Sequence, residues 1–415
     1  MSPSPPSFDQ LGIHPHLLKS LHKLGFKEPT PIQYKAIPKA LKGHDLRASA
    51  DTGTGKTAAF LLPMIQRMML NKGNRQSARG LILLPTRELA QQVLRACQSY
   101  LPRSSKIGTV LLCGGMPYPP QLRQLKAPHD ILIATPGRIV DLINKKKISL
   151  KSIEMVVLDE ADRMLDMGFI EPVEFLLSKT PASRQTLLFS ATFNPEVCAF
   201  SERLLSKPLE IIIPPAHKES GKISHSLHYV DHRSHKEEIL DHLLKQPTTD
   251  RSIVFTATKR QADELTQSLR AGEHRATALH GDMNQRQRTS AIGKLHKGSV
   301  SVLVATDVAA RGIDIPALTH VINFDIPQQG DDYIHRTGRV GRAGATGNAH
   351  TFATYREEHI VRNIEKALDQ PLTASAFPGL EPSPRKASPK KGGKKRSSFP
   401  LAIKKKSRVW KRKRT

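Results

Sequence analysis

The chain of 415 residues is long enough for two or three domains, and 38% of its residues are hydrophobic, which suffices to build their cores. Its net charge of +27 and pI near 10.1 favour a polyanionic partner, above all nucleic acid, although charge alone leaves a membrane surface open. The composition excludes a disulfide-built secreted scaffold, since Cys97, Cys113 and Cys198 are its only cysteines and lack metal-binding spacing.

The N-terminal residues carry no basic-then-apolar targeting signal. No apolar run approaches the roughly 18 residues that a membrane span requires. We therefore expect a soluble cytoplasmic protein without a membrane partner.

The first strong motif is the glycine-rich run at residues 50–57, which has the composition of a phosphate-binding loop. Its glycines let backbone N–H groups close around phosphate oxygens, Lys56 reaches the β- and γ-phosphates, and the Thr57 hydroxyl can ligate Mg²⁺. The strand expected before it, at residues 45–50, is weak because Arg47 and Ser49 interrupt its apolar pattern.

Short apolar runs alternate with helical-looking stretches along the first half, and each run ends at a polar or glycine-containing turn. This alternation is typical of a parallel sheet covered by helices on both faces. The strands that it predicts are residues 80–84, 109–112, 130–134, 155–158 and 185–189.

The run at 155–158 leads directly into the acidic tetrad Asp159-Glu160-Ala161-Asp162. Asp159 can hold the Mg²⁺ of a bound nucleotide, and Glu160 can orient the attacking water. A solvated acidic helix start is the alternative, which the strand-like run before the tetrad disfavours. The loop and the tetrad together indicate nucleotide hydrolysis.

Residues 214–222 interrupt the alternation with prolines, charges and glycine, and we interpret them as a linker. A second α/β half follows it without a phosphate-binding loop, so one ATP site is expected to serve both halves. The strands predicted for this half are residues 252–255, 275–279, 302–305, 321–324 and 350–353.

Apolar periodicity ends after Leu368, and residues 381–415 hold 15 Lys and Arg against one acidic residue. A composition rich in Pro, Ser, Gly and Lys is typical of disorder. We interpret this tail as a nucleic-acid tether, with a merely solvated or targeting basic run as the alternative.

Polar clusters follow the predicted strands, where ligands bind in open α/β sheets. These clusters are residues 85–89, 114–115, 135–138, 190–192, 280–282, 285–288, 306–314 and 335–342. Together with the segment at 25–33 and the upstream Phe8, these clusters resemble the DEAD-box family of superfamily 2 RNA helicases over about residues 8–360. The resemblance implies an α/β fold with two tandem RecA-like domains, and the tail is similar to that of bacterial RhlE-like members. The expected divisions are an N-terminal domain at 1–213, the linker at 214–222, a C-terminal domain at 223–370 and the basic tail at 371–415.

The resemblance also implies roles in the ATP site. Phe26 would stack on adenine, with a core aromatic as the equal alternative, and Gln33 would hydrogen-bond the adenine edge. The implied catalytic residues are Lys56, Asp159, Glu160, Arg339 and Arg342, and the Mg²⁺ ligands are Thr57 and Asp159. The implied ATP-binding residues are Phe26, Gln33, Ala50, Thr52, Gly53, Thr54, Gly55, Lys56, Thr57 and Asp314.

Two further groups of residues follow from the same resemblance. Those that couple hydrolysis to RNA are Asp162, Ser190, Thr192 and His335, and a plain Ser/Thr turn is the alternative for Ser190 and Thr192. For the two arginines, Arg339 and Arg342, the alternative is a solvated basic turn. Those that bind the RNA backbone are Thr86, Arg87, Gly115, Thr135, Arg138, Gly281, Gln285, Arg288 and Thr306. Hydroxyls, glycine amides and guanidinium groups suit sequence-independent contacts to phosphates and 2′-hydroxyls, although each residue alone could be ordinary polar surface.

The expected function is an ATP-dependent RNA helicase that binds and bends single-stranded RNA and opens short duplexes. An ATP-gated RNA clamp with little strand separation is the main alternative. A small-molecule phosphotransferase is disfavoured because the second half duplicates the core and no acceptor pocket is evident. The partners typical of the family are ribosomal or mRNA-decay ribonucleoproteins.

Overall fold

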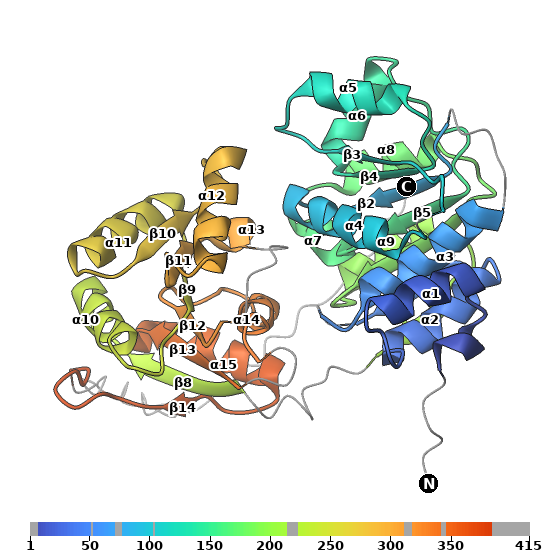
Figure 1. Cartoon of the computed structure of the whole chain (residues 1–415). Coiled ribbons are helices and arrows are strands. Elements are labelled where there is room, and N and C mark those ends of the chain that lie inside the picture. Colours follow the sequence, from blue (N-terminus) through green and yellow to red (C-terminus); the bar gives the residue numbers. More distant parts are fainter. Residues whose placement is uncertain are drawn as a thin grey trace, which may run out of the picture. The chain divides into compact units, whose positions relative to one another are not determined.

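The structure is a computed structural model that describes residues 7–50, 53–70, 77–102, 104–213, 223–310, 318–341 and 346–383 (Figure 1). The predicted linker at 214–222 and the tail from residue 384 lie outside the described residues. Across the described ranges, no helix combines the length and apolar character needed to cross a membrane.

The first half contains a seven-stranded parallel sheet with the strand order β3-β4-β2-β5-β6-β1-β7. Its strands are β1 Leu46–Ser49, β2 Gly80–Leu83, β3 Thr109–Leu112, β4 Ile131–Ala134, β5 Met155–Leu158, β6 Gln185–Ser190 and β7 Leu209–Ile212. Its helices are α1 Pro15–Lys23, α2 Pro31–Leu41, α3 Lys56–Leu70, α4 Arg87–Tyr100, α5 Tyr118–Lys126, α6 Pro136–Asn144, α7 Ala161–Asp166, α8 Ile170–Ser178 and α9 Pro195–Leu204, with a short 3₁₀ turn η1 at Phe8–Leu11.

The second half repeats this topology in a parallel sheet of seven strands with the order β10-β11-β9-β12-β13-β8-β14. Its strands are β8 Ile223–Tyr229, β9 Ser252–Phe255, β10 Ala276–Leu279, β11 Val302–Ala305, β12 His320–Asn323, β13 Gly347–Ala353 and β14 Thr373–Ala374. Its helices are α10 Arg233–Leu244, α11 Lys259–Ala271, α12 Gln285–His296, α13 Asp307–Ala310, α14 Gly330–Thr337 and α15 Glu358–Leu368, with η4 at Tyr355–Glu357. The predicted pair of α/β halves with parallel sheets is confirmed.

Alternate residues of the central strands build the core on opposite faces of each sheet. In the first half, Ile82 and Val157 belong to one buried apolar cluster, whereas Leu83 and Leu158 belong to the other. Because both faces are buried, these strands are continuous apolar runs, which is why sequence predicts them well. Cys97 and Cys113 are buried free thiols, and burial raises the pKa of each to about 12.

Strands at and beside the sheet edges carry weaker signals. The predicted weak strand β1 forms because its polar side chains find partners: Arg47 contacts Glu210 of β7 at 2.7 Å, and Ser49 donates to the Ala191 carbonyl at 3.2 Å. Strands β7, β8 and β14 are absent from the sequence-based expectation, because a glutamate interrupts the four residues of β7, β8 is largely polar, and β14 has two residues. Apolar runs alone therefore miss these strands.

The ordered second half continues past the boundary expected at residue 370. Leu372 is buried, β14 pairs with β8 at the outer edge of the sheet (Figure 1), and the Ser375 N–H donates to the Leu227 carbonyl at 2.8 Å. We name residues 371–380 the C-terminal strap. The strap covers the β8 edge, which would otherwise expose unpaired backbone groups.

A column of aromatic rings joins the strap to the sheet. Phe377 stacks on His228 with centroids 5.1 Å apart, His228 stacks on His350 at 5.3 Å, and His350 stacks on His320 at 5.6 Å. His228 Nδ1 lies 3.0 Å from the Ser375 carbonyl, and its Nε2 lies 3.0 Å from His350 Nδ1. This hydrogen-bond chain fits neutral imidazoles, because the carbonyl requires a donor at Nδ1 and leaves Nε2 free to accept.

Acidification is expected to destabilise the second half. Burial lowers the pKa of His228 to about 4, and burial and the two neighbouring histidines lower that of His350 to about 3, whereas an unfolded histidine titrates near 6.5. The folded state therefore binds fewer protons, so stability is present above pH 6.5 and is lost as the pH falls from 6.5 towards 4. Each of these histidines contributes a slope of about 1.4 kcal/mol per pH unit within that window.

Hydrogen exchange of β13 amides between pH 7.5 and 5 measures this loss, after correction for the intrinsic exchange rate. His228→Phe keeps the ring stack but cannot be protonated, so the pH slope should become shallower by one proton. The control His359→Gln changes an exposed histidine and should keep the full slope. An equal slope in His228→Phe and the wild type would contradict the assignment.

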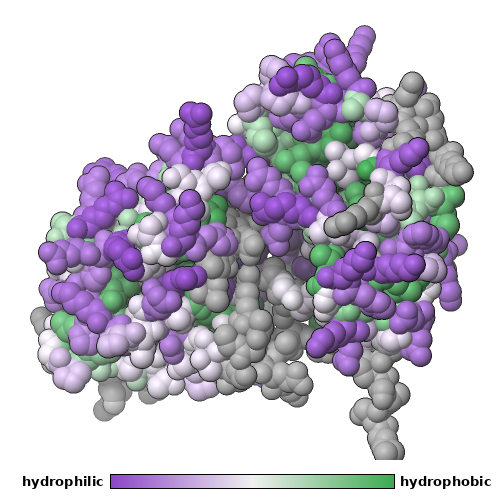
Figure 2. Space-filling view, viewed as in Figure 1, coloured by the Kyte–Doolittle hydropathy of each residue, from purple (hydrophilic) through white to green (hydrophobic). Residues whose placement is uncertain are grey.

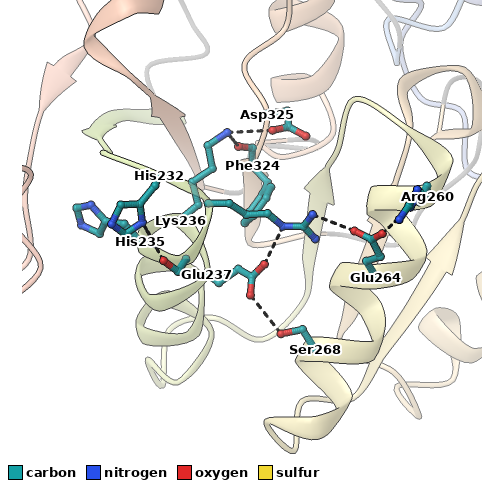
Figure 3. Close-up of polar contacts among 11 residues, drawn as sticks. His232, His235, Lys236, Glu237, Arg260, Glu264, Ser268, Phe324 and Asp325 are labelled. Carbon is teal, nitrogen blue, oxygen red and sulfur yellow. Dashed lines mark hydrogen bonds and ion pairs between the residues drawn. The ribbon is translucent and has the colours of Figure 1, made fainter.

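Hydrophilic side chains cover most of the face drawn in Figure 2, with smaller hydrophobic areas between them. Part of this polarity forms ion-pair networks on α10 and α11 (Figure 3). There, Arg233 contacts both Glu237 and Glu264, while Lys236 donates to the Phe324 carbonyl at 2.7 Å and to Asp325 at 2.9 Å. Lys236 thereby fastens α10 to the end of β12, next to the segment that leads into α14.

Candidate functional site

Three neighbouring strands bring the main motifs of the first half together. The order β5-β6-β1 places the ends of these strands side by side, although they are far apart in the sequence. The Ala50 N–H donates to the Ser190 carbonyl at 3.1 Å, which joins the start of the phosphate-binding loop to the end of β6. The loop, the acidic tetrad and Ser190–Thr192 therefore share one edge of the sheet, as expected for a ligand site in an open α/β fold.

The phosphate-binding loop turns into α3 through glycines in left-handed conformations, with φ of +86° at Gly53 and +93° at Gly55. Lys56 begins α3, and its side chain is buried with an Nζ that has no hydrogen-bond partner among the described residues. A buried ammonium without a partner is costly, so this position fits an anionic ligand such as a phosphate. Thr54 and Thr57 are partly exposed beside it, and Thr52 lies outside the described residues.

Gln33 lies against this loop. Its carboxamide accepts from the Thr30 N–H at 3.0 Å and donates to the Gly55 carbonyl at 3.2 Å, and a side chain at Gly55 would collide with it. Phe26 is partly exposed and packs edge-on against Phe8 and Tyr100, with centroids 5.9 and 5.7 Å away. The structure thus places Gln33 against the phosphate-binding loop, whereas Phe26 contacts two aromatic rings, Phe8 and Tyr100.

The acidic tetrad begins at the end of β5. Asp159 accepts from the Glu160 N–H at 3.0 Å, and Glu160 has a left-handed φ of +58° before α7. Burial raises the pKa of Asp159 to about 6, with Lys56 opposing this shift and Glu160 adding to it. A cation beside Asp159 would therefore favour its carboxylate form.

Glu160 is held by a residue that sequence analysis did not single out. Arg163 donates from Nη1 to Glu160 Oε2 at 2.8 Å, and both side chains are less than a tenth exposed. The spacing of three residues at a helix start is a signal that could have suggested this pair. The ion pair fixes the orientation of the carboxylate that is predicted to position water.

Asp162 connects the tetrad to the segment after β6. Its Oδ2 accepts from the Ala191 N–H at 3.1 Å, from the Thr192 N–H at 3.2 Å and from the Thr192 hydroxyl at 3.4 Å. The Ser190 hydroxyl instead accepts from the Asp162 N–H at 3.3 Å. Both predicted hydroxyls thus contact Asp162, but that of Ser190 contacts its backbone and not its carboxylate.

In the second half, His335 lies in the last turn of α14, and Arg339 follows this helix as a buried side chain. Arg336, to which sequence analysis assigns no role, makes two contacts of 2.6 Å to the Asp307 carboxylate. It also donates to Asn323 at 3.0 Å and to the Asp325 carbonyl at 2.7 Å. It joins the segment after β11 to the helix that precedes Arg339. Asp314 and Arg342 lie outside the described residues.

The RNA candidates of the first half gather around the turn after β3. Gly114 donates its N–H to the Thr135 hydroxyl at 3.2 Å, Arg138 donates to the Met116 carbonyl at 2.9 Å, and a side chain at Gly115 would collide with the Arg87 guanidinium. Thr86 caps α4 by accepting from the Leu89 N–H at 3.3 Å. Two guanidinium groups thus flank one glycine turn, an arrangement that suits a phosphate chain.

The RNA candidates of the second half follow β10 and β11. Gln285 opens α12, Arg288 on the same helix donates to the Ala309 carbonyl at 3.2 Å, and Ala309 in turn donates its N–H to the Thr306 carbonyl at 3.1 Å. A side chain at Gly281 would meet open space. These contacts connect α12 to the turn after β11.

At the ends of β1, β5 and β6, the first half brings together a buried lysine, two glycine amides, a hydroxyl and acidic side chains. Together these groups can bind and hydrolyse a nucleoside triphosphate. In the part of the chain that the structure describes, no group of three His, Cys, Asp or Glu side chains could hold a metal ion.

Comparison with known proteins agrees with this arrangement. Residues 30–200 match the DEAD/DEAH box helicase family, and residues 235–344 match the helicase conserved C-terminal domain. The chain is 42% identical to the DEAD-box ATP-dependent RNA helicase CshA of Bacillus cereus, over 90% of this chain and 70% of that protein. It is 40% identical to the ATP-dependent RNA helicase SrmB of Haemophilus influenzae, over 97% of this chain and 90% of that protein.

Solved structures of RNA-bound proteins are also similar. Saccharomyces cerevisiae Dbp5 bound to RNA and ADP BeF3 superimposes with a TM-score of 0.80 and 32% identity, over 89% of this chain and 95% of that one. A structure of Mss116p bound to single-stranded RNA and AMP-PNP gives a TM-score of 0.80 and 28% identity, over 92% of this chain and 82% of that one.

Proposed function

The chain belongs to the DEAD/DEAH box helicase family, and on this premise we propose that it uses ATP hydrolysis to bind, bend and locally unwind short RNA duplexes. The two α/β halves would close over ATP and a single RNA strand, and hydrolysis would reset them. The candidate RNA-binding residues offer hydroxyls, guanidinium groups and glycine amides, which suit contacts to the RNA backbone, so recognition should be largely independent of sequence. Ribosomal or mRNA-decay ribonucleoproteins in the cytoplasm are the proposed targets.

The observation that carries this proposal is the contact of Asp162 with Ala191 and Thr192. It joins the acidic tetrad to the segment after β6 through three hydrogen bonds to one carboxylate oxygen. A change around Asp159 and Glu160 on hydrolysis can therefore reach the end of a second strand directly. Such a connection suits an enzyme that couples nucleotide hydrolysis to a structural change.

The residues present fit Mg²⁺-ATP. Thr57 and Asp159 offer the hard oxygen ligands that Mg²⁺ prefers, and substrate phosphates commonly complete its shell. Mg²⁺ would neutralise phosphate charge when bound. Lys56 would bind the phosphates, Glu160 would orient the attacking water, and Arg339 and Arg342 would stabilise charge at the γ-phosphate. Asp314 would contact the ribose, and His335 would contribute to coupling.

Two assays test the proposal. ATP hydrolysis should rise when single-stranded RNA is added, and a short RNA duplex should separate only when ATP is present. RNA-independent hydrolysis would contradict the coupling. RNA-stimulated hydrolysis and ATP-dependent retention without strand separation would favour the RNA-clamp alternative.

Adenine selectivity is expected to depend on Gln33, because the phosphate-binding loop cannot distinguish bases. The Gln33 carboxamide also contacts Gly55, so Gln33→Ala should raise the KM for ATP about tenfold, in line with the loss of a hydrogen-bonded group of roughly 1.4 kcal/mol. GTP should be a poor substrate of the wild type. Steady-state kinetics with both nucleotides measures the effect, and equal kcat/KM values for ATP and GTP in the wild type would contradict the prediction.

A further inference from the structure

The ring of Tyr118 contacts two cationic side chains beside the turn after β3. The Arg138 guanidinium carbon lies 4.1 Å from the centroid of its ring, and the Lys145 Nζ lies 4.4 Å from the same centroid. Lys145 also donates from Nζ to the Tyr118 hydroxyl at 3.0 Å. Tyr118 opens α5, and the two cations come from α6 and from the residue that caps its C-terminus.

Arg138 is buried by this packing but is not fully satisfied. Its Nη2 donates to the Met116 carbonyl at 2.9 Å, whereas its Nη1 has no hydrogen-bond partner among the described residues. No carboxylate forms an ion pair with it in the described parts of the chain, so the positive charge is balanced only by the ring and a carbonyl. A guanidinium with a spare donor suits an additional anionic partner.

Lys145 extends the positive charge away from Arg138. The two residues are seven positions apart, so their backbone positions lie on one side of α6, roughly 10 Å apart along the helix axis, while both charged groups lie over the Tyr118 ring. Lys145 keeps 54% of its side chain exposed, and its ion pair with Asp141 at 3.0 Å offsets only part of the charge of the run at 145–147. Lys145 can therefore reach a phosphate beyond the one predicted at Arg138.

We propose that Tyr118 is a positioning residue of the RNA site and that Lys145 is an additional RNA-phosphate contact. The ring holds both cations in one strip that begins at the Gly115 turn, and a cation held over an aromatic face loses less freedom when it binds phosphate. The inference rests on the proposed function, because it requires RNA as the ligand. The inference assigns a contribution to RNA binding to two residues, Tyr118 and Lys145, for which the family resemblance implies no role.

The test measures binding of a single-stranded RNA and the RNA dependence of ATP hydrolysis between 50 and 200 mM salt. Each lost phosphate contact should flatten the plot of log affinity against log salt by about 0.7. Lys145→Ala should show one such loss, and Tyr118→Ala up to two, with a higher apparent KM for RNA and an unchanged kcat at saturating RNA. Tyr118→Phe keeps the ring over both cations and should retain most of the affinity.

Lys147→Ala is the matched control. It removes an exposed lysine of the same run without a contact to Tyr118, and it should leave the slope unchanged. If Lys145→Ala and Lys147→Ala give the same slope, or if Tyr118→Ala binds RNA like the wild type, the inference is wrong. If circular dichroism shows that Tyr118→Ala is unfolded, the comparison of Lys145→Ala with Lys147→Ala still tests whether Lys145 contacts an RNA phosphate. A wild-type protein that does not bind RNA would instead refute the proposed function.

Discussion

Replacing Glu160 by glutamine is expected to lower kcat for ATP hydrolysis by about 10² to 10⁴, the usual contribution of a residue that handles the proton of the nucleophile. The amide keeps the shape of the side chain and one oxygen that can still accept from Arg163, which is 2.8 Å away. It loses the negative charge that orients the attacking water. Binding of ATP and RNA should persist, so the variant should remain trapped on RNA.

Single-turnover ATP hydrolysis and RNA retention in the presence of ATP measure these two effects. Glu171→Gln is the matched control, since it makes the same chemical change at an exposed glutamate at the start of α8 and should hydrolyse ATP normally. A thermal melt shows whether the buried Arg163 tolerates the loss of its charged partner. Near-normal hydrolysis by correctly folded Glu160→Gln would refute the role assigned to this carboxylate.

Replacing Arg339 by alanine is expected to reduce RNA-stimulated kcat by roughly 10³, the lower end of the contribution of an arginine finger. Arg339 directly follows α14, whose Arg336 is fixed by two 2.6 Å contacts to Asp307. This anchoring gives the segment a defined position from which its guanidinium could meet the γ-phosphate when the halves close. ATP binding to the first half should be largely preserved.

The expected signature is a loss in kcat with little change in KM, because the contact forms with the transition state. Arg362→Ala removes an arginine of the same half that is 72% exposed and paired only with Glu358 in the described parts of the chain, so its kcat should match that of the wild type. Arg342→Ala should behave like Arg339→Ala if both act as fingers. A defect confined to KM would make Arg339 a ground-state binding residue.

Much of the fold was accessible from the sequence because the central strands are buried on both faces. Runs such as Ile131–Ala134 and Val302–Ala305 are continuously apolar, and a continuous apolar run needs no knowledge of its neighbours to be recognised. An edge strand such as β7 buries only one of its faces. In Leu209–Ile212, more buried side chains therefore alternate with exposed ones. The pairing of such strands was therefore visible only after the sheet order was known.

The chemistry proposed for the site is readable from the sequence alone, because the glycine-rich loop and the acidic tetrad are each made of adjacent residues whose local geometry follows from their composition. The side chains that hold these groups in place become visible only in the folded chain, where distant segments meet. The Arg336 contacts with Asp307, the ring column from Phe377 to His320, and the Tyr118 contacts with Arg138 and Lys145 join residues from different elements. In a parallel sheet whose strand order differs from the chain order, such neighbours are set by packing and not by spacing along the sequence.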